Sequence, residues 1–277
     1  MNTYKVQLKD NYDVEGGELE FLLADAPYDQ PAPEWRRPMV IVVPGGGYWM
    51  VSKREGVPVA SRFFAKGYQV CVLTYLCNPD GARYPEQLAE LAAAVDYVKK
   101  NAEKMHVNPD EIFVVGFSAG GHLTADLAVE WQCVKQKTGM DLDCRPRAVG
   151  LAYPVISYKT RHADSYKNLL DGYTEEAKAE LEKELSLEDR VTEDTPPAFL
   201  WTTVEDSCVP PENTLLFALS LQRNKIPYEL HVYPKGDHGA STCDWEINPA
   251  CAPFMRKNAQ WTDDCADFFR SYCVEKF

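Results

Sequence analysis

A strand, a tight glycine turn and a helix follow one another around Ser118, and this order constrains the fold more than any other feature. The apolar run 112–115 is typical of a buried strand, 116–120 read Gly-Phe-Ser-Ala-Gly, and 123–131 are helix-like. Such a turn is strained, and a side chain at either glycine would meet neighbouring backbone. A G-x-S-x-G between strand and helix is typical of a nucleophile elbow, which exposes the serine beside a helix N-terminus. We therefore predict that Ser118 is a nucleophile rather than a buried turn residue.

Strand-like and helix-like stretches alternate along most of the chain. Two alternating stretches, 4–9 and 18–24, indicate antiparallel edge strands, and the rest predicts parallel β-α-β units. We expect an α/β-hydrolase fold, with a mostly parallel central sheet and helices on both faces, in a single domain of residues 1–277. The expected parallel strands are 39–43, 69–75, 112–115, 148–153, 198–204 and 228–233, and the expected helices are 57–66, 85–104, 123–131, 212–224 and 258–272.

The stretch 157–194 interrupts this alternation. It is rich in charged residues, and 175–189 contain most of an acidic helix. We interpret 157–194 as a small helical cap inserted over the strand ends rather than as a second domain. The simplest explanation of its charges is a solvated helix face.

Composition and charge narrow the class of protein. The chain of 277 residues is 45% hydrophobic, which is enough for a large core, and its net charge is −13. This charge argues against nucleic acids and anionic membranes as partners and leaves a small-molecule substrate, with a homo-oligomer open. Residues 1–10 are polar, no apolar run approaches a membrane span, and the nine cysteines and five histidines show no metal-ligand spacing. We expect a cytoplasmic protein with reduced cysteines and with no cofactor and no metal.

A nucleophilic serine needs a base and an acid that orients the base. His238 lies in the loop 236–239, just past the last expected strand, at the same sheet edge as Ser118. Asp206 and Glu205 both follow the strand 198–204, and the spacing Asp-x-x-Val-Pro favours Asp206 while Glu205 stays open. The chain order serine, aspartate, histidine is that of α/β hydrolases.

The other four histidines are less suitable bases because of where they stand. His106 precedes the elbow strand at its far end. His122 follows the elbow on the helix and is expected to support the local turn. His162 is in the expected cap, and His231 is inside a strand.

An oxyanion hole requires two backbone N–H groups aimed at one oxygen. Ala119, next to the nucleophile, supplies one. The glycine loop after strand 39–43 supplies the other, for which we choose Gly46, with Gly45 and Gly47 as alternatives. A phosphate cradle is disfavoured, because neither a Walker lysine nor a G-x-G-x-x-G pattern follows.

Several motifs together resemble bacterial α/β-hydrolase esterases, and more closely the carbohydrate acetylesterases and feruloyl/acetylxylan esterase-like (BD-FAE-like) group. The resemblance covers roughly residues 35 to 240. Pro44 stands where many relatives have histidine, and Leu76 where they often have arginine, so a substrate-binding arginine is not implied at that position. The matching motifs are the elbow, Pro-Gly-Gly-Gly-Tyr at 44–48, Asp206-x-x-Val-Pro, Gly-x-His-Gly at 236–239, the stretch 54–60, Tyr84-Pro85 and 194–197.

The resemblance implies a serine esterase that hydrolyses small acyl esters, acetyl above all, on carbohydrates of the xylo-oligosaccharide type. Substrate contacts are expected from Gly47, Tyr48, Trp49 and Trp245, whose aromatic rings, if exposed, would stack on sugars and otherwise belong to the core. Three alternatives stay open: a general short-chain carboxylesterase, a formamidase acting on an N-formyl aromatic, and a non-catalytic binding protein of the same fold.

Overall fold

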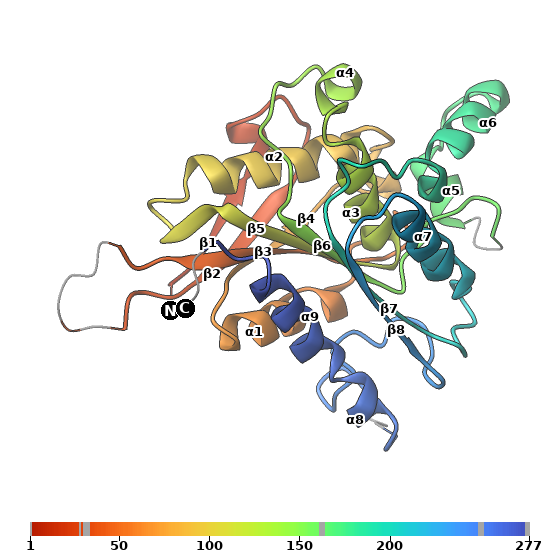
Figure 1. Ribbon diagram of the computed structural model, residues 1–277. Coiled ribbons are helices and arrows are strands. Elements are labelled where there is room, and N and C mark those ends of the chain that lie inside the picture. Colours follow the sequence, from red (N-terminus) through yellow and green to blue (C-terminus); the bar gives the residue numbers. More distant parts are fainter. Residues whose placement is uncertain (1, 28, 30–33, 161–163, 249–251, 275–277) are drawn as a thin grey trace.

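The computed structural model describes the chain except residues 1, 28, 30–33, 161–163, 249–251 and 275–277. His162 and Cys251 therefore lie outside the described residues. In the described part of the chain, one twisted sheet runs through the centre of the molecule (Figure 1). Its strands in spatial order are β1 (Asn2–Gln7), β2 (Glu18–Leu23), β4 (Gln69–Thr74), β3 (Arg37–Val43), β5 (Val107–Phe117), β6 (Ala148–Ala152), β7 (Ala198–Thr203) and β8 (Tyr228–Tyr233).

The strand directions agree with the sequence prediction. Strand β1 pairs antiparallel with β2, and β2 pairs antiparallel with β4, whereas all other neighbouring strands are parallel. Because parallel strands end at the same edge, the segments that follow β3, β5, β7 and β8 converge there. The predicted α/β architecture is therefore confirmed.

Helices cover both faces of the sheet (Figure 1). Helices α2, α3 and α7 lie on one face, and α1 and α9 lie on the other. The helices are α1 (Val57–Ala65), α2 (Glu86–Lys100), α3 (Ser118–Glu130), α4 (Val134–Thr138), α5 (Asp164–Leu169), α6 (Glu175–Glu184), α7 (Glu212–Arg223), α8 (Met255–Asn258) and α9 (Trp261–Arg270), with short 3-10 turns η1 (Leu8–Asp10), η2 (Lys53–Glu55), η3 (Asn78–Asp80) and η4 (Leu187–Asp189).

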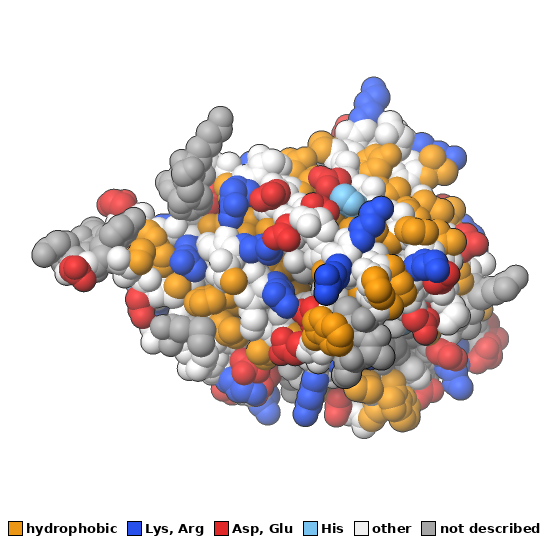
Figure 2. Space-filling model, turned by 90° about the horizontal axis from the view of Figure 1, so that it is seen from below, with side chains coloured by type: hydrophobic (Ala, Val, Ile, Leu, Met, Phe, Trp, Pro, Cys, Tyr) orange, Lys and Arg blue, Asp and Glu red, His pale blue; other side chains and the backbone are white. Residues whose placement is uncertain are grey.

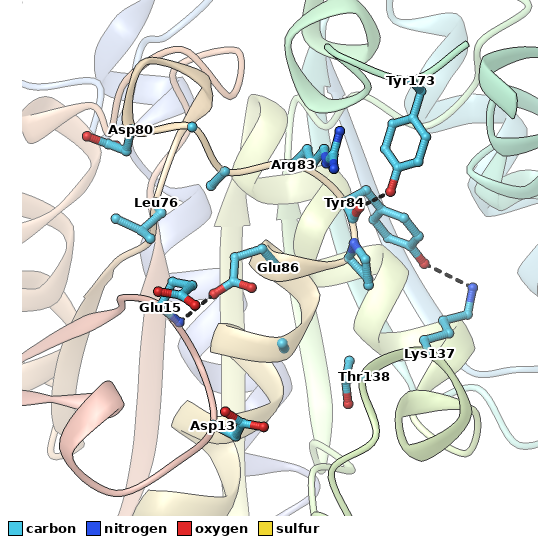
Figure 3. Close-up of a pocket in the computed structure, with 14 residues that line it drawn as sticks. Asp13, Glu15, Leu76, Asp80, Arg83, Tyr84, Glu86, Lys137, Thr138 and Tyr173 are labelled. Atoms are coloured by element: carbon cyan, nitrogen blue, oxygen red, sulfur yellow. Dashed lines mark hydrogen bonds between the residues drawn. The ribbon is translucent and has the colours of Figure 1, made fainter. Parts of the chain in front are cut away.

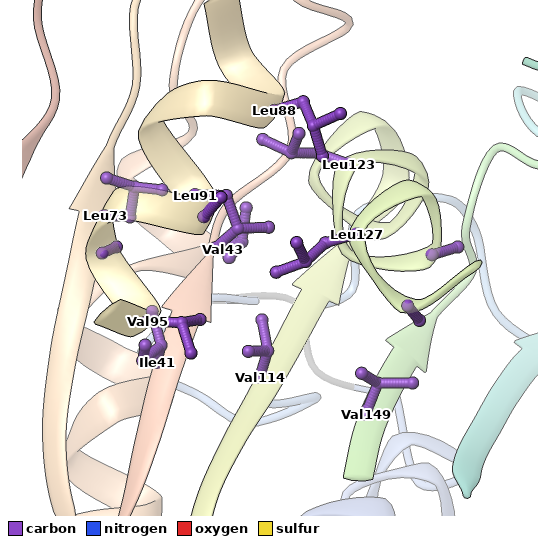
Figure 4. Packing of buried hydrophobic residues seen from close by; sticks show 14 of the residues in the cluster. Ile41, Val43, Leu73, Leu88, Leu91, Val95, Val114, Leu123, Leu127 and Val149 are labelled. Carbon is purple, nitrogen blue, oxygen red and sulfur yellow. The ribbon is translucent and has the colours of Figure 1, made fainter. Parts of the chain in front are cut away.

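The core has two layers because successive side chains of a strand point to opposite faces. In β3, Ile41 and Val43 pack among residues of α2 and α3, while Val40 and Val42 pack on the side of α1 and α9. Figure 4 shows the first layer. Each fully buried aliphatic side chain contributes about 1.5–3 kcal/mol to folding. A continuous apolar run such as 39–43 is therefore what a strand covered on both faces requires.

The predicted final helix over 258–272 is present as α9, but it is shorter and begins at Trp261. A short helix, α8, ends at Asn258 just before it, and the turn 259–260 separates the two. Asn258 donates a hydrogen bond to the Lys235 carbonyl, 2.8 Å away. Trp261 is fully buried and donates to the Ser241 carbonyl at 2.9 Å. Helix α2 is also shorter than predicted and ends at Lys100.

The segment 157–194 lies between β6 and β7 in the chain and contains α5, α6 and η4. No helix among the described residues is long and apolar enough to cross a membrane. The face that carries α1, α8 and α9 shows acidic and basic side chains interspersed with small hydrophobic patches (Figure 2).

Candidate active site

Ser118 stands at the turn between β5 and α3. Its φ angle is +52°, a left-handed conformation that is strained for a residue with a side chain. A Cβ atom on Gly120 would lie 2.3 Å from the Val43 and Pro44 carbonyl oxygens. A Cβ atom on Gly116 would lie 2.3 Å from the Gly120 carbonyl oxygen. The predicted requirement for glycine on both sides of the serine is confirmed.

The structure brings together the three residues that the sequence singled out. His238 Nδ1 lies 2.7 Å from Asp206 Oδ2, and His238 Nε2 lies 2.8 Å from Ser118 Oγ. The Asp206 side chain is 1% exposed, and its other oxygen accepts hydrogen bonds from the backbone N–H groups of Cys208 (3.0 Å) and Val209 (2.8 Å). An ionised carboxylate accepts only, so Nδ1–H donates to Asp206 and Nε2 is free to accept the Ser118 hydroxyl proton.

The structure separates Asp206 from the alternative acid, Glu205. Glu205 is exposed, and its contact with the site is a hydrogen bond from the Gly236 N–H at 3.4 Å. Strand β7 ends at Thr203, so both acids lie in the turn that follows it, and of the two it is Asp206 whose side chain is directed at the histidine.

His122 is buried and does not bind the serine hydroxyl. Its Nε2 lies 3.0 Å from the Leu185 carbonyl oxygen, which can only accept, so Nε2 carries the proton. Its Nδ1 therefore accepts from the Tyr48 hydroxyl, 2.9 Å away. Burial lowers the pKa of His122 to about 4, which keeps the ring neutral. His122 thus joins the glycine loop to the segment 157–194.

Hydrogen bonding in the glycine loop after β3 distinguishes among the three candidate oxyanion donors, Gly45, Gly46 and Gly47. The Gly45 N–H donates to Glu55 Oε2 at 2.9 Å, so it is already committed to another acceptor. Gly46 and Gly47 have φ angles of +127° and +65°, and within the described residues their N–H groups have no hydrogen-bond acceptor. Ala119 is the second residue of α3, where a backbone N–H has no intrahelical acceptor.

The predicted aromatic contacts differ in exposure. Tyr48 is 1% exposed and packs against Tyr75 and His122, so of the two alternatives left open for its ring the structure shows a core position. Its positive φ of 57° continues the turn begun by the glycines and directs the ring inward. Trp49 and Trp245 are 57% and 63% exposed.

A cavity of about 410 Å³ opens beside His238. Its walls are apolar at Ile247, Phe254 and Met255 and polar at Arg54 and Asn248, which bond to each other at 3.1 Å. A cavity of mixed polarity next to a reactive group suits a small organic substrate.

A second cavity, of about 460 Å³, lies beside the N-terminal end of α2 (Figure 3). Tyr173 donates to the Tyr84 carbonyl at 2.7 Å, and Lys137 donates to the Tyr84 hydroxyl at 2.9 Å. None of the catalytic, oxyanion-hole or substrate-contact residues expected from the sequence lines it, although Leu76 and Tyr84-Pro85 do. Within the described residues, no group of three or more His, Cys, Asp or Glu side chains is placed to hold a metal ion.

Sequence reasoning missed two buried residues at this site. Glu55 bonds to the glycine loop, and Tyr153 packs its ring against His238 with centroids 4.9 Å apart. Glu55 belongs to the stretch 54–60 that carries part of the family resemblance, but no motif indicates its contacts.

Comparisons with known proteins agree with this geometry. The chain matches the BD-FAE family over residues 28–221. It is 35% identical to endo-1,4-beta-xylanase B of Butyrivibrio fibrisolvens over 86% of this chain and 37% of that protein. It is 30% identical to an acetylxylan esterase of Xylanibacter ruminicola over 74% of this chain and 42% of that protein. The chain thus spans about two fifths of the length of these two relatives.

A solved structure shares the fold over nearly the whole chain. The acetyl ester-xyloside bifunctional hydrolase of Caldicellulosiruptor lactoaceticus is 30% identical and superposes with a TM-score of 0.80, covering 97% of this chain and 96% of that one. The family match includes the glycine loop, the elbow and Asp206, and ends before His238. The chain belongs to the BD-FAE family and has the α/β-hydrolase fold.

Proposed function

We propose that this protein is a serine esterase that removes small acyl groups, acetyl above all, from carbohydrate esters of the xylo-oligosaccharide type. The observation that carries the proposal is the hydrogen-bonded chain from Ser118 Oγ through His238 to Asp206, at 2.8 and 2.7 Å. The names of two relatives, an acetylxylan esterase and an acetyl ester-xyloside hydrolase, support the acyl group and the sugar.

The proposed reaction has two acyl-transfer steps. Ser118 Oγ attacks the ester carbonyl carbon while its proton passes to His238 Nε2, and the oxyanion accepts from the N–H groups of Ala119 and Gly46. The intermediate collapses, the carbon–oxygen bond to the alcohol breaks, and His238 protonates the departing oxygen. A water molecule then attacks the acyl-enzyme, His238 takes its proton, and the acid leaves as Ser118 recovers its hydrogen.

The surroundings of Ser118 support a small acyl group and a larger alcohol. The buried ring of Tyr48 and the His122 ring occupy the space behind the glycine loop. The cavity that His238 lines provides room for an alcohol group close to the proposed base. Exposed Trp49 and Trp245 offer ring faces on which a sugar would stack.

We also propose that 157–194 form a cap within a single domain. Asn168 of α5 donates to the Gly47 carbonyl at 2.8 Å, and the Leu185 carbonyl accepts from His122. The cap residues therefore support the glycine loop from outside.

The test compares acetate release from acetylated xylo-oligosaccharides and from p-nitrophenyl acetate. We expect Ser118→Ala to lower kcat on both by about 10⁶-fold. Ser207→Ala is the control, because Ser207 is exposed and bonds to Asp237 at 3.1 Å. Undiminished turnover by Ser118→Ala would refute the proposal.

The substrate is decided in the same assay. Hydrolysis of p-nitrophenyl acetate without release from the sugar would replace the carbohydrate substrate with simple esters. Hydrolysis of an N-formyl aromatic amide alone would indicate a formamidase.

A further inference from the structure

Glu55 is a buried carboxylate close to the proposed nucleophile. The residue is 3% exposed. Its Oε2 accepts from the Gly45 N–H at 2.9 Å. A Cβ atom built on Gly45 would lie 3.0 Å from this oxygen and 2.8 Å from Ser118 Cβ. The carboxylate thus lies beside Gly45, close to Ser118 and shielded from solvent.

The other oxygen of Glu55 leads to the histidine loop. Its Oε1 accepts from the Tyr153 hydroxyl at 2.7 Å. That hydroxyl in turn accepts from the Ser241 N–H at 2.9 Å, three residues after His238. The Ser241 side chain closes the circuit by donating to the Arg54 carbonyl at 2.6 Å. One carboxylate therefore connects two loops that are distant in the sequence.

Tyr153 also touches His238 directly. The two rings have centroids 4.9 Å apart and meet edge to face at 67°. The Tyr153 ring is enclosed by Trp201, with centroids 4.9 Å apart, and is 2% exposed, so it has little freedom to move. The hydrogen bond from the Tyr153 hydroxyl to Glu55 therefore helps to fix the ring that packs against His238.

Glu55 is the acceptor in its hydrogen bonds with the Gly45 N–H and the Tyr153 hydroxyl. The Ser241 N–H occupies Tyr153 as an acceptor, so the single tyrosine proton points to Glu55. Burial raises the pKa of Glu55, and the hydrogen bonds from Tyr153 and Gly45 act in the opposite direction. A glutamine at this position would accept from one donor and present its N–H₂ to the other, so one of the two loops would lose its anchor.

We propose that Glu55 is a positioning residue that anchors the glycine loop and the histidine loop to one another, so that the oxyanion donors and His238 keep their geometry around Ser118. This inference rests on the proposed function. Displacing reacting groups by about 1 Å lowers turnover by about 10²-fold. Glu55 is buried and the ring faces proposed for the sugar, on Trp49 and Trp245, are exposed, so we expect the loss to fall on kcat rather than KM.

The test measures kcat and KM for p-nitrophenyl acetate in Glu55→Gln, Tyr153→Phe and Glu90→Gln. Glu90 is the matched control: it is fully buried and accepts from the Leu76 N–H at 2.9 Å, but lies on α2 outside this network. We expect Glu55→Gln to lower kcat by about 10²-fold with KM within about threefold. Tyr153→Phe keeps the Gly45 bond and should lose about tenfold, and the double variant should lose less than the product of the two single losses. Glu90→Gln should keep the wild-type kcat.

The outcomes separate this inference from the proposed function. If Ser118→Ala is inactive while Glu55→Gln keeps kcat within threefold, or raises only KM, the positioning role is refuted and the esterase stands. If Ser118→Ala is active, the proposed function fails. Circular dichroism and thermal unfolding check each variant, and if Glu55→Gln does not fold, an unchanged kcat in Tyr153→Phe refutes the inference.

Discussion

Replacing Asp206 by asparagine tests the proposed triad most sharply, because the change keeps the shape of the side chain. An asparagine oxygen can still accept from the Cys208 and Val209 N–H groups at 3.0 and 2.8 Å, so the loop stays in place. The amide N–H₂ then faces His238 Nδ1, where the carboxylate accepted a proton at 2.7 Å. Two donors cannot share this contact, so the imidazole moves its proton to Nε2.

A protonated Nε2 cannot accept from Ser118 Oγ at 2.8 Å, and the nucleophile loses its base. A tautomer change of this kind lowers kcat by about 10⁴-fold, which corresponds to about 5.5 kcal/mol of transition-state stabilisation. The assay is steady-state hydrolysis of p-nitrophenyl acetate at pH 7.5, with unfolding followed by circular dichroism.

Glu205→Gln is the matched control, because Glu205 is the adjacent, exposed acid with one long hydrogen bond of 3.4 Å to the Gly236 N–H. We expect its kcat to stay within about twofold of wild type, as for surface changes with small energies. If Asp206→Asn retains a tenth of the wild-type kcat, or if Glu205→Gln is the inactive variant, the assignment of the acid is refuted.

Two further expectations concern stability and the substrate. Burial raises the pKa of Glu90 from its ordinary 4.5 to about 8. A carboxyl whose pKa is higher in the folded state stabilises the fold at low pH, and this stability is lost as pH rises from about 4.5 to about 8. Between pH 5 and pH 9 the free energy of unfolding of the wild type should therefore fall by a few kcal/mol more than that of Glu90→Gln, at about 1.4 kcal/mol per pKa unit. If the free energy of unfolding, measured with urea, changes equally with pH in the two proteins, this expectation is contradicted. Trp49→Ala and Trp245→Ala should each raise KM for acetylated xylo-oligosaccharides about fivefold, as expected for a lost stacking contact of about 1 kcal/mol, and leave KM for p-nitrophenyl acetate unchanged. Equal effects on both substrates would argue against sugar stacking.

The elements around Ser118 could be predicted because their signals are local. A buried strand, two glycines and a helix within about twenty residues specify the elbow. Parallel β-α-β units then bring the ends of β5, β7 and β8 to one edge, so Asp206 and His238 could be placed near the serine without knowing any distance. The spacing Asp-x-x-Val-Pro favoured Asp206, but Glu205 stayed open because the sequence does not state which of two adjacent side chains in a turn faces the histidine.

Tyr48 was harder to place because its direction depends on backbone angles that the sequence does not state. An aromatic residue after three glycines is compatible with an exposed ring and with a buried one. The turn has φ of +127° at Gly46 and +65° at Gly47, and Tyr48 continues it at +57°. This geometry turns the Tyr48 ring toward His122 and leaves Trp49 outside.

The network of Glu55 shows where local reasoning ends. Its partners come from positions separated by 10 residues at Gly45 and 98 at Tyr153, and Ser241 is a further 88 residues away. A carboxylate with no pairing motif is ordinarily assigned to the surface. Burying it requires donors for both oxygens, and each donor here belongs to a loop beside the proposed nucleophile. The same bonds that make the burial of this charge tolerable therefore hold the glycine loop and the histidine loop in a single arrangement. In the proposed mechanism Asp206 acts on the proton of His238, and Glu55 is proposed to act on the position of the groups around it, so the two buried carboxylates would have separate roles in proton transfer and in geometry.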